Sequence, residues 1–303
     1  MSDTLTTDAT EATDDRALRH WTFHHPHKVK IGSDAHRQMF CHMLLETHDP
    51  YKPAVIAWPK LEPDALKRVT SLPIWDIAVQ TEGRASINVS TYGASLTDPL
   101  LRAAIEMDAG EEARHKHVLS RLVAAYGIEL APEPPYPPPK DPEWAWMFTG
   151  YSECIDSFFA FGLFRSAKES GFFPAELVDT FEPVIQEEAR HILFFINWVT
   201  WYRRTMPWWR RPWHALRVAR IWVRLVYERI GIARGMDANG KMQDSNFLAT
   251  NSDAFDTDMG LRGMLELCLS ENDRRMAGYD ARLLRPTLVP RLARLALKFI
   301  RKE

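Results

Sequence analysis

The segment Glu-Glu-Ala-Arg-His occurs twice in this sequence, at residues 111–115 and 187–191. In each copy the second Glu and the His are three residues apart, so on a helix both side chains point from the same face. A carboxylate and an imidazole presented together are common ligands of transition metals. One such pair arises readily by chance, but two identical copies are far more specific. The repeat therefore predicts two helices that each offer one oxygen and one nitrogen ligand to a metal, the alternative being two salt-bridged surface faces.

Two further glutamates stand at matched distances from the repeats. Glu82 lies 30 residues before Glu112, and Glu153 lies 35 residues before Glu188. Each distance fits one long helix, a turn and part of the next helix, so antiparallel packing would bring the carboxylates to one level. The neighbours on their helix faces are mainly apolar or small, and such surroundings make an unpaired carboxylate costly to bury. Either glutamate alone could be an exposed helix residue, but as members of a set of six they favour a metal cage.

Capping residues along the sequence predict four long helices that carry these residues. Aspartates and prolines at their starts and glycines at their ends are typical helix caps. A proline-rich linker over 131–140 should form an extended crossing between the second and third helices. The expected helices cover about 73–92, 99–127 and 141–171, with a fourth that begins between 174 and 183 and runs to about 201.

The order of the six residues resembles the ferritin-like diiron carboxylate superfamily, over roughly residues 73–201. The resemblance implies an all-α protein, a ferritin-like four-helix bundle with extra N- and C-terminal helices. It also implies two bound iron ions, or an iron–manganese pair. Two ferrous ions carry four positive charges, which four carboxylates would neutralise. The ligands would be Glu82, Glu112, His115, Glu153, Glu188 and His191.

The same resemblance assigns roles to residues around the ligands. In diiron oxygenases an acid next to the motif orients a ligand histidine, although simple surface ion pairs are an equal alternative here. Ser157 matches a position at which hydroxylating members often carry Thr or Ser near the oxygen-binding face, and is the candidate catalytic residue. Asp156 is expected to form hydrogen bonds near the site or to act as an alternate ligand. The supporting residues of the two repeats would be Glu111, Arg114, Glu187 and Arg190.

By resemblance, the expected activity is an O2-dependent hydroxylation or oxidation of a small apolar organic substrate, with electrons from a reductase or ferredoxin. Aromatic residues of the third and fourth helices, such as Trp146, Phe161 and Trp198, would line an apolar pocket or form bundle core. A ferroxidase or a peroxide-detoxifying, rubrerythrin-like protein is the alternative. The long extensions argue against a storage cage, and the C-x-x-C iron site usual in rubrerythrins is absent. A metal-free scaffold would require the six residues to be coincidental.

Composition sets the remaining expectations. The net charge of −2 gives no reason to expect nucleic acid as a partner, and three widely separated cysteines favour a reducing, cytoplasmic compartment.

We expect an acidic disordered tail (1–20), an N-terminal helical extension (21–72), the diiron bundle (73–202) and a basic, Trp- and Arg-rich C-terminal extension (203–303). In that extension, the segment 203–241 contains ten Lys or Arg residues and only two acidic residues. We expect a helix there that covers the bundle, with peripheral membrane contact or partner binding as the alternative. Homodimerisation is a further option.

Overall fold

A computed structural model of the chain describes residues 20–72, 74–233 and 260–300, and within these residues it is built from helices without a β-strand. The predominantly helical class expected from the sequence is therefore confirmed. The predicted acidic tail lies almost entirely outside the described residues. The central helices are α4 (Trp75–Ala94), α5 (Pro99–Ala125), α6 (Pro142–Glu169) and α7 (Ala175–Thr205).

The ends of these helices follow the capping chemistry of the sequence. Asp98 and Asp141 cap α5 and α6, each accepting a hydrogen bond from a backbone N–H of the first turn, with proline at the first helical position. Gly127 and Gly171, with φ of 64° and 65°, follow the same two helices in the left-handed conformation that glycine adopts without strain. Local sequence therefore fixes the length of the helices that carry the repeats.

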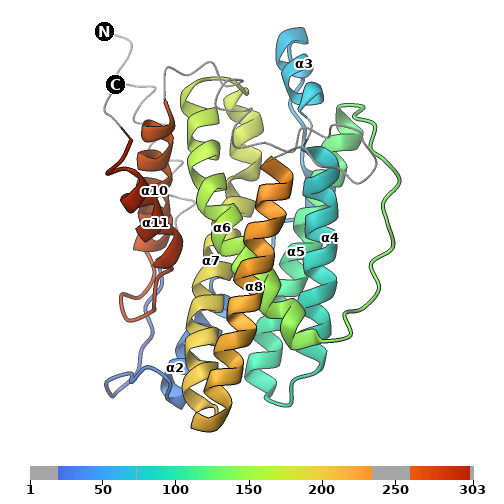
Figure 1. Ribbon diagram of the computed structural model, residues 1–303. Helices are drawn as coiled ribbons and strands as arrows, with labels where there is room; N and C mark the ends of the chain where they lie inside the picture. Colours follow the sequence, from blue (N-terminus) through green and yellow to red (C-terminus); the bar gives the residue numbers. More distant parts are fainter. Residues whose placement is uncertain (1–19, 73, 234–259, 301–303) are drawn as a thin grey trace.

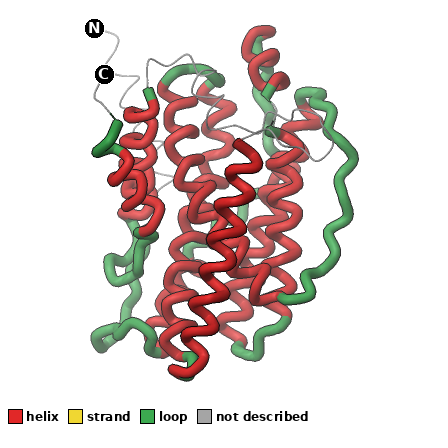
Figure 2. The backbone as a smooth tube through the Cα atoms, in the orientation of Figure 1, coloured by secondary structure: helices red, strands yellow, loops and turns green. Residues whose placement is uncertain are grey.

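The four central helices form two antiparallel pairs, α4 with α5 and α6 with α7 (Figure 1). The predicted proline-rich crossing is present: the connection from α5 to α6 is an irregular loop that runs along the outside of the bundle to its opposite end (Figure 2). As a result α5 and α6 run in the same direction. One long crossover between two antiparallel pairs brings the faces of all four helices to a common centre.

The remaining helices pack around this centre. Helix α2 packs against α5 and α7, α8 against α6, and α10 against α6 and α7, while α11 lies against α6 and α10. Among the described helices none is long and apolar enough to cross a membrane. The bounds are α2 (Asp34–Glu46), α3 (Pro63–Ser71), α8 (Arg211–Ala233), α10 (Leu261–Ala277) and α11 (Leu288–Ala296), with short 3-10 turns at η1 (Pro53–Val55) and η2 (Trp208–Arg210).

Three local features complete the course of the chain. The connector over 50–62 is irregular apart from η1 and leads directly into α3, where Pro63 occupies the first turn of the helix. Helix α7 continues through Pro183 as one element. Helix α11 ends at Ala296, and the chain continues as a turn.

Large aromatic side chains pack between the first turns of α6 and the last turns of α7. The Trp146 ring lies edge-on to Phe195 and Trp198, with centroid separations of 5.6 and 5.5 Å. Trp146, Phe161 and Trp198 are all fully buried. Of the two roles considered for these aromatics, bundle core is the one that their packing supports.

Candidate metal centre

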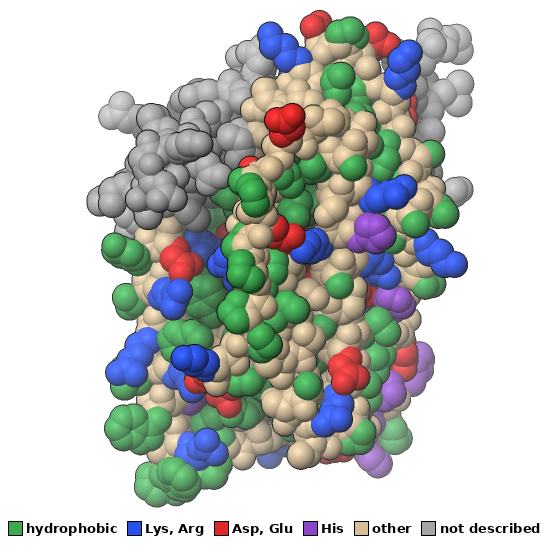
Figure 3. All heavy atoms as spheres, turned by 90° about the vertical axis from the view of Figure 1, so that its right-hand side faces the viewer, with side chains coloured by type: hydrophobic (Ala, Val, Ile, Leu, Met, Phe, Trp, Pro, Cys, Tyr) green, Lys and Arg blue, Asp and Glu red, His purple; other side chains and the backbone are tan. Residues whose placement is uncertain are grey.

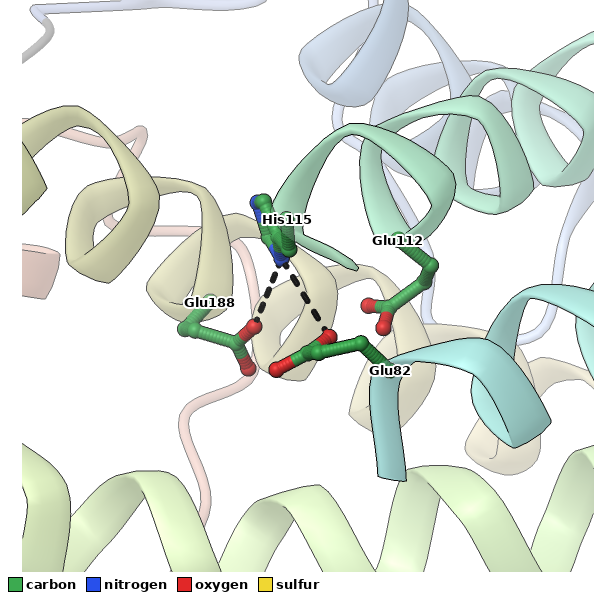
Figure 4. A group of neighbouring side chains, drawn as sticks. All are labelled: Glu82, Glu112, His115 and Glu188. Carbon is green, nitrogen blue, oxygen red and sulfur yellow. Dashed lines mark ion pairs between the residues drawn. The ribbon is translucent and has the colours of Figure 1, made fainter. Parts of the chain in front are cut away.

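Four of the predicted ligands meet between α4, α5 and α7. One potential ligand atom from each of Glu82, Glu112, His115 and Glu188 lies within 4.8 Å of the others. The four side chains point toward one another from three helices, Glu112 and His115 sharing α5 (Figure 4). His115 Nδ1 is 3.2 Å from a Glu188 oxygen and 3.7 Å from a Glu82 oxygen. Three carboxylates and one imidazole thus surround a single point.

A second group adjoins the first and shares a residue with it. Ligand atoms of Asp108, Glu112 and His191 also lie within 4.8 Å of one another. Because Glu112 belongs to both groups, its carboxylate stands between the two histidines. His115 and His191 face each other there, with ring centroids 5.7 Å apart. The arrangement offers two adjacent positions for a cation, joined by one carboxylate.

Glu153, on α6, adds a carboxylate from the fourth helix. Its Oε1 atom is buried and has no hydrogen-bond partner. Burial raises the pKa of Glu153 well above its ordinary value, and the negative charges of Asp108 and Glu188 raise it further. The structure therefore places five of the six predicted ligands in the two groups, with Asp108 as an additional carboxylate. Glu153 belongs to neither group, although its carboxylate interacts electrostatically with Asp108 and Glu188.

The decisive feature of this region is a set of buried polar atoms without hydrogen-bond partners. Glu112 Oε1 and His191 Nδ1 are 2.9 Å apart and form an ion pair when the histidine is protonated, but the contact does not have the geometry of a hydrogen bond. Buried polar atoms are nearly always paired, because an unpaired one costs about 1–3 kcal/mol. Several orphaned ligand-type atoms in one place fit a bound cation better than they fit a purely structural network. They are Asp108 Oδ1, Glu112 Oε1, His115 Nδ1, Glu153 Oε1 and His191 Nδ1.

The far side of His191 is held by Glu111 from the neighbouring helix. His191 Nε2 lies 2.8 Å from Glu111 Oε2. Glu111 in turn receives two hydrogen bonds from Arg190, at 2.8 and 3.0 Å. Arg190 is anchored by a 2.8 Å bond to Thr47 and by the carbonyl of Leu44. The first repeat thus supports the histidine of the second.

The second repeat supports the first in the same way. His115 Nε2 lies 2.8 Å from Glu187 Oε2, and Arg114 pairs with the other Glu187 oxygen. A carboxylate only accepts hydrogen bonds, so each imidazole presents Nε2–H to its glutamate. In the neutral imidazole the lone pair then sits on Nδ1, which faces the centre. A partner on the outer nitrogen orients a metal-ligating histidine in this way.

The charges of the cluster are strongly coupled. Burial raises the pKa of Glu112 well above its ordinary value, and the neighbouring Glu82 carboxylate raises it further. Burial alone would lower the pKa of His115 and His191, but the surrounding carboxylates raise both well above the ordinary range. Without a metal, the centre therefore retains protons to offset its negative charge. Metal cations would replace those protons.

Ser157 and Asp156 lie on different sides of α6. Ser157 is buried and donates a 2.9 Å hydrogen bond to Glu188 Oε2, so it touches one of the predicted ligands. Asp156, in contrast, is half exposed and pairs with Arg229 of α8. The expectation that Asp156 lies near the ligands is not met, because α6 turns that position toward α8.

Sequence reasoning missed three residues that belong to this region. Asp108 lies one turn before Glu112 on the same helix face, and that spacing was a usable signal. His48 Nδ1 lies 2.6 Å from Glu111 Oε1, and the Tyr51 hydroxyl lies 3.3 Å from Glu187 Oε2. Both belong to the connection after α2, whose place in the fold no local pattern reveals.

Comparison with family profiles, curated proteins and solved structures finds no match for this chain. Within the described residues the chain is a helical protein whose clustered Glu and His side chains can bind a metal, and their arrangement is compatible with a diiron site.

Proposed function

We propose that this protein is a non-haem diiron oxidoreductase with a ferritin-like bundle, which uses O2 to hydroxylate or otherwise oxidise an apolar organic substrate. The observation that carries the proposal is the set of buried carboxylate and imidazole atoms without hydrogen bonds that gather in the candidate metal centre. The crossover between two antiparallel helix pairs supports the bundle assignment, because di-iron carboxylate proteins use this connectivity.

The residues present fit two iron ions. Oxygen-rich sites with a few imidazoles suit iron and manganese, whereas closed thiolate sites suit zinc. Glu112, which belongs to both groups, would be available to both ions, and Asp108 would add an oxygen ligand beside His191. The other ligands would be Glu82, His115, Glu153, Glu188 and His191. Two ferrous ions held there would supply the two electrons needed to reduce O2.

The protein's own residues position and seal the centre. Glu111 and Glu187 fix the orientation and tautomer of the two histidines, and Ser157 orients the Glu188 carboxylate. The helix faces that carry the ligands also carry buried apolar side chains, including Val89 on α4 and Phe195 on α7. Exclusion of water by these walls strengthens the electrostatic interactions within the site.

Metal analysis tests the ligand assignment first. Protein reconstituted anaerobically with Fe(II) should retain about two iron ions per chain. The Glu112→Ala and His191→Ala variants should retain less than one, while Asp156→Asn, a change on the outer face of α6, should bind as the original does. Metal retention unaffected by changes at Glu112 and His191 would reject the centre.

O2 consumption tests the reaction. The reduced protein should consume O2 faster in the presence of a suitable lipophilic compound and yield a hydroxylated or oxidised product. Ferric mineral formation without stimulation by any organic compound would reject the oxygenase and favour the ferroxidase alternative. Iron retention therefore tests the metal site, and O2 consumption tests the reaction, independently of each other.

A further inference from the structure

Helix α8 carries hydrophobic residues on the face that it turns away from the bundle. Trp213, Leu216, Val223 and Tyr227 recur at intervals of three, seven and four residues, which places them along one side of the helix. They are 72%, 45%, 71% and 75% exposed. Surface helices ordinarily present polar residues to solvent. We call these four residues, with Trp208 and Trp209 of η2, the outer stripe.

Packing of α8 against the bundle does not explain the outer stripe. The contact with α6 uses the opposite side of the helix, where Ile221 and Leu225 are fully buried and His214 is nearly so. Trp208 and Trp209, in the turn just before α8, are 78% and 57% exposed. Contiguous apolar exposure of this kind marks an interaction surface.

The charge around the outer stripe is strongly positive. Between residues 203 and 229 there are eight arginines and a single acid, Glu228. Arg220 lies within the stripe, and the exposed Arg210 lies over the Trp209 ring at 6.0 Å. Figure 3 shows basic and hydrophobic side chains interspersed at its lower left edge, which corresponds to the front of the molecule in Figure 1, where α8 lies. Tryptophan beside arginine is the typical composition of helices that lie in a membrane interface.

We propose that the outer stripe docks this protein on the surface of an anionic phospholipid membrane, with α8 in the plane of the interface. The tryptophans and aliphatic side chains would enter the boundary between headgroups and acyl chains, and the arginines would contact lipid phosphates. A second copy of the chain fits this surface less well, because a twofold contact would bring two arginine-rich helices together. The proposal does not depend on the metal centre.

Vesicle co-sedimentation of the full-length protein tests the docking. We expect binding to vesicles of phosphatidylcholine mixed with phosphatidylglycerol, weak binding to phosphatidylcholine alone, and release as salt is raised. The double variant Trp213→Ser with Val223→Ser should bind at least about tenfold more weakly, because it removes the deepest apolar contacts. Each lost arginine should weaken binding about fivefold, so Arg210→Gln with Arg220→Gln should lose about 25-fold.

A charge-matched control separates local docking from general attraction. The double variant Lys60→Gln with Lys67→Gln removes the same number of positive charges from exposed positions in and just before α3, and it should bind nearly as the original does. Circular dichroism and iron content should be unchanged in all variants, because every substituted side chain is exposed.

Three outcomes would overturn the proposal. They are no binding to anionic vesicles at low salt, equal losses in the control and Arg210/Arg220 variants, and unchanged binding after the Trp213/Val223 change. Analytical ultracentrifugation supplies a fourth criterion: a dimer that the Trp213/Val223 change abolishes would assign the stripe to self-association instead.

Discussion

The two copies of Glu-Glu-Ala-Arg-His are identical in sequence, but they occupy different surroundings. Arg190 and Glu111, which together support His191, have side-chain exposures of 1% and 0%. Arg114 and Glu187, which support His115, have exposures of 13% and 3%. Helix α2 and its C-cap enclose the Arg190–Glu111 pair, because the Leu44 carbonyl and the Thr47 hydroxyl accept hydrogen bonds from Arg190. The Arg114–Glu187 pair makes no such contact with α2 in the described part of the chain.

The second pair is covered by the connection after α2. The Arg114 guanidinium stacks over the Tyr51 ring at 4.2 Å, and the Tyr51 hydroxyl reaches Glu187. Asp108 breaks the symmetry further, because the additional carboxylate lies on the His191 side. A repeated motif therefore gives two similar ligand sets in unequal environments, and we expect the half that contains His191 to be the more rigid and the more sensitive to substitution.

The largest expected difference between the halves is in stability. Arg190→Met removes the main cationic partner of Glu111, whose carboxylate is fully buried. We expect this change to lower the free energy of unfolding by about 3–5 kcal/mol. Arg114→Met should cost about 1–3 kcal/mol, since its partner is less deeply enclosed. Urea unfolding of both metal-free variants measures the difference. Equal losses would show that α2 does not set the two halves apart.

The second largest expected difference is the loss of metal affinity when Glu111 or Glu187 is changed. Changing Glu111 or Glu187 to Gln keeps the shape but removes the charge that orients the ligand histidine, and such changes weaken metal binding about 10–100-fold. We expect Glu111→Gln to fall at the upper end, because Glu111 also balances Arg190. Titration with Mn(II) followed by calorimetry gives both values. A larger loss in Glu187→Gln would reverse the order proposed for the halves.

Stability and metal binding should respond to pH in opposite directions. The folded-state pKa of His115 and of His191 is raised above the ordinary 6.5. Their contribution to metal-free stability is therefore fully present below pH 6.5 and is lost as the pH rises through the raised values. A ligand imidazole must be neutral, so metal affinity should increase with pH, by about tenfold per pH unit for each proton released. Thermal unfolding with and without Mn(II) across the neutral range measures both trends, and parallel trends would contradict this account.

The smallest expected effect concerns the carboxylate present in only one half. Burial raises the pKa of Asp108 to about 6, so its oxygen becomes ionised and available to a cation as the pH rises through that value. Asp108→Asn should weaken metal binding several-fold and flatten the pH dependence near pH 6. Asp156→Asn, on the outer face of α6, is the matched control and should leave both unchanged. Identical behaviour of the two variants would remove Asp108 from the ligand set.

The outline of the helices and the ligand candidates could be predicted because both depend on short-range geometry. Three-residue spacing puts Glu and His on one helix face, and Asp-Pro starts with Gly ends delimit α5 and α6. Helix α3 was missed because its short apolar pattern sits among prolines, which obscured it. Asp108 was overlooked although the same spacing rule places it beside Glu112.

The sequence by itself determined which side chains share a helix face, because that face depends only on the 3.6-residue period. Tertiary packing alone decided which partner each side chain meets. Only the packed bundle shows that Glu111 supports His191 rather than its own neighbour His115, and that α2 encloses Arg190. The same holds for α8, whose pattern is compatible with a cover or a docking helix. Its packed position shows that it covers α6 with one face while exposing the outer stripe on the other.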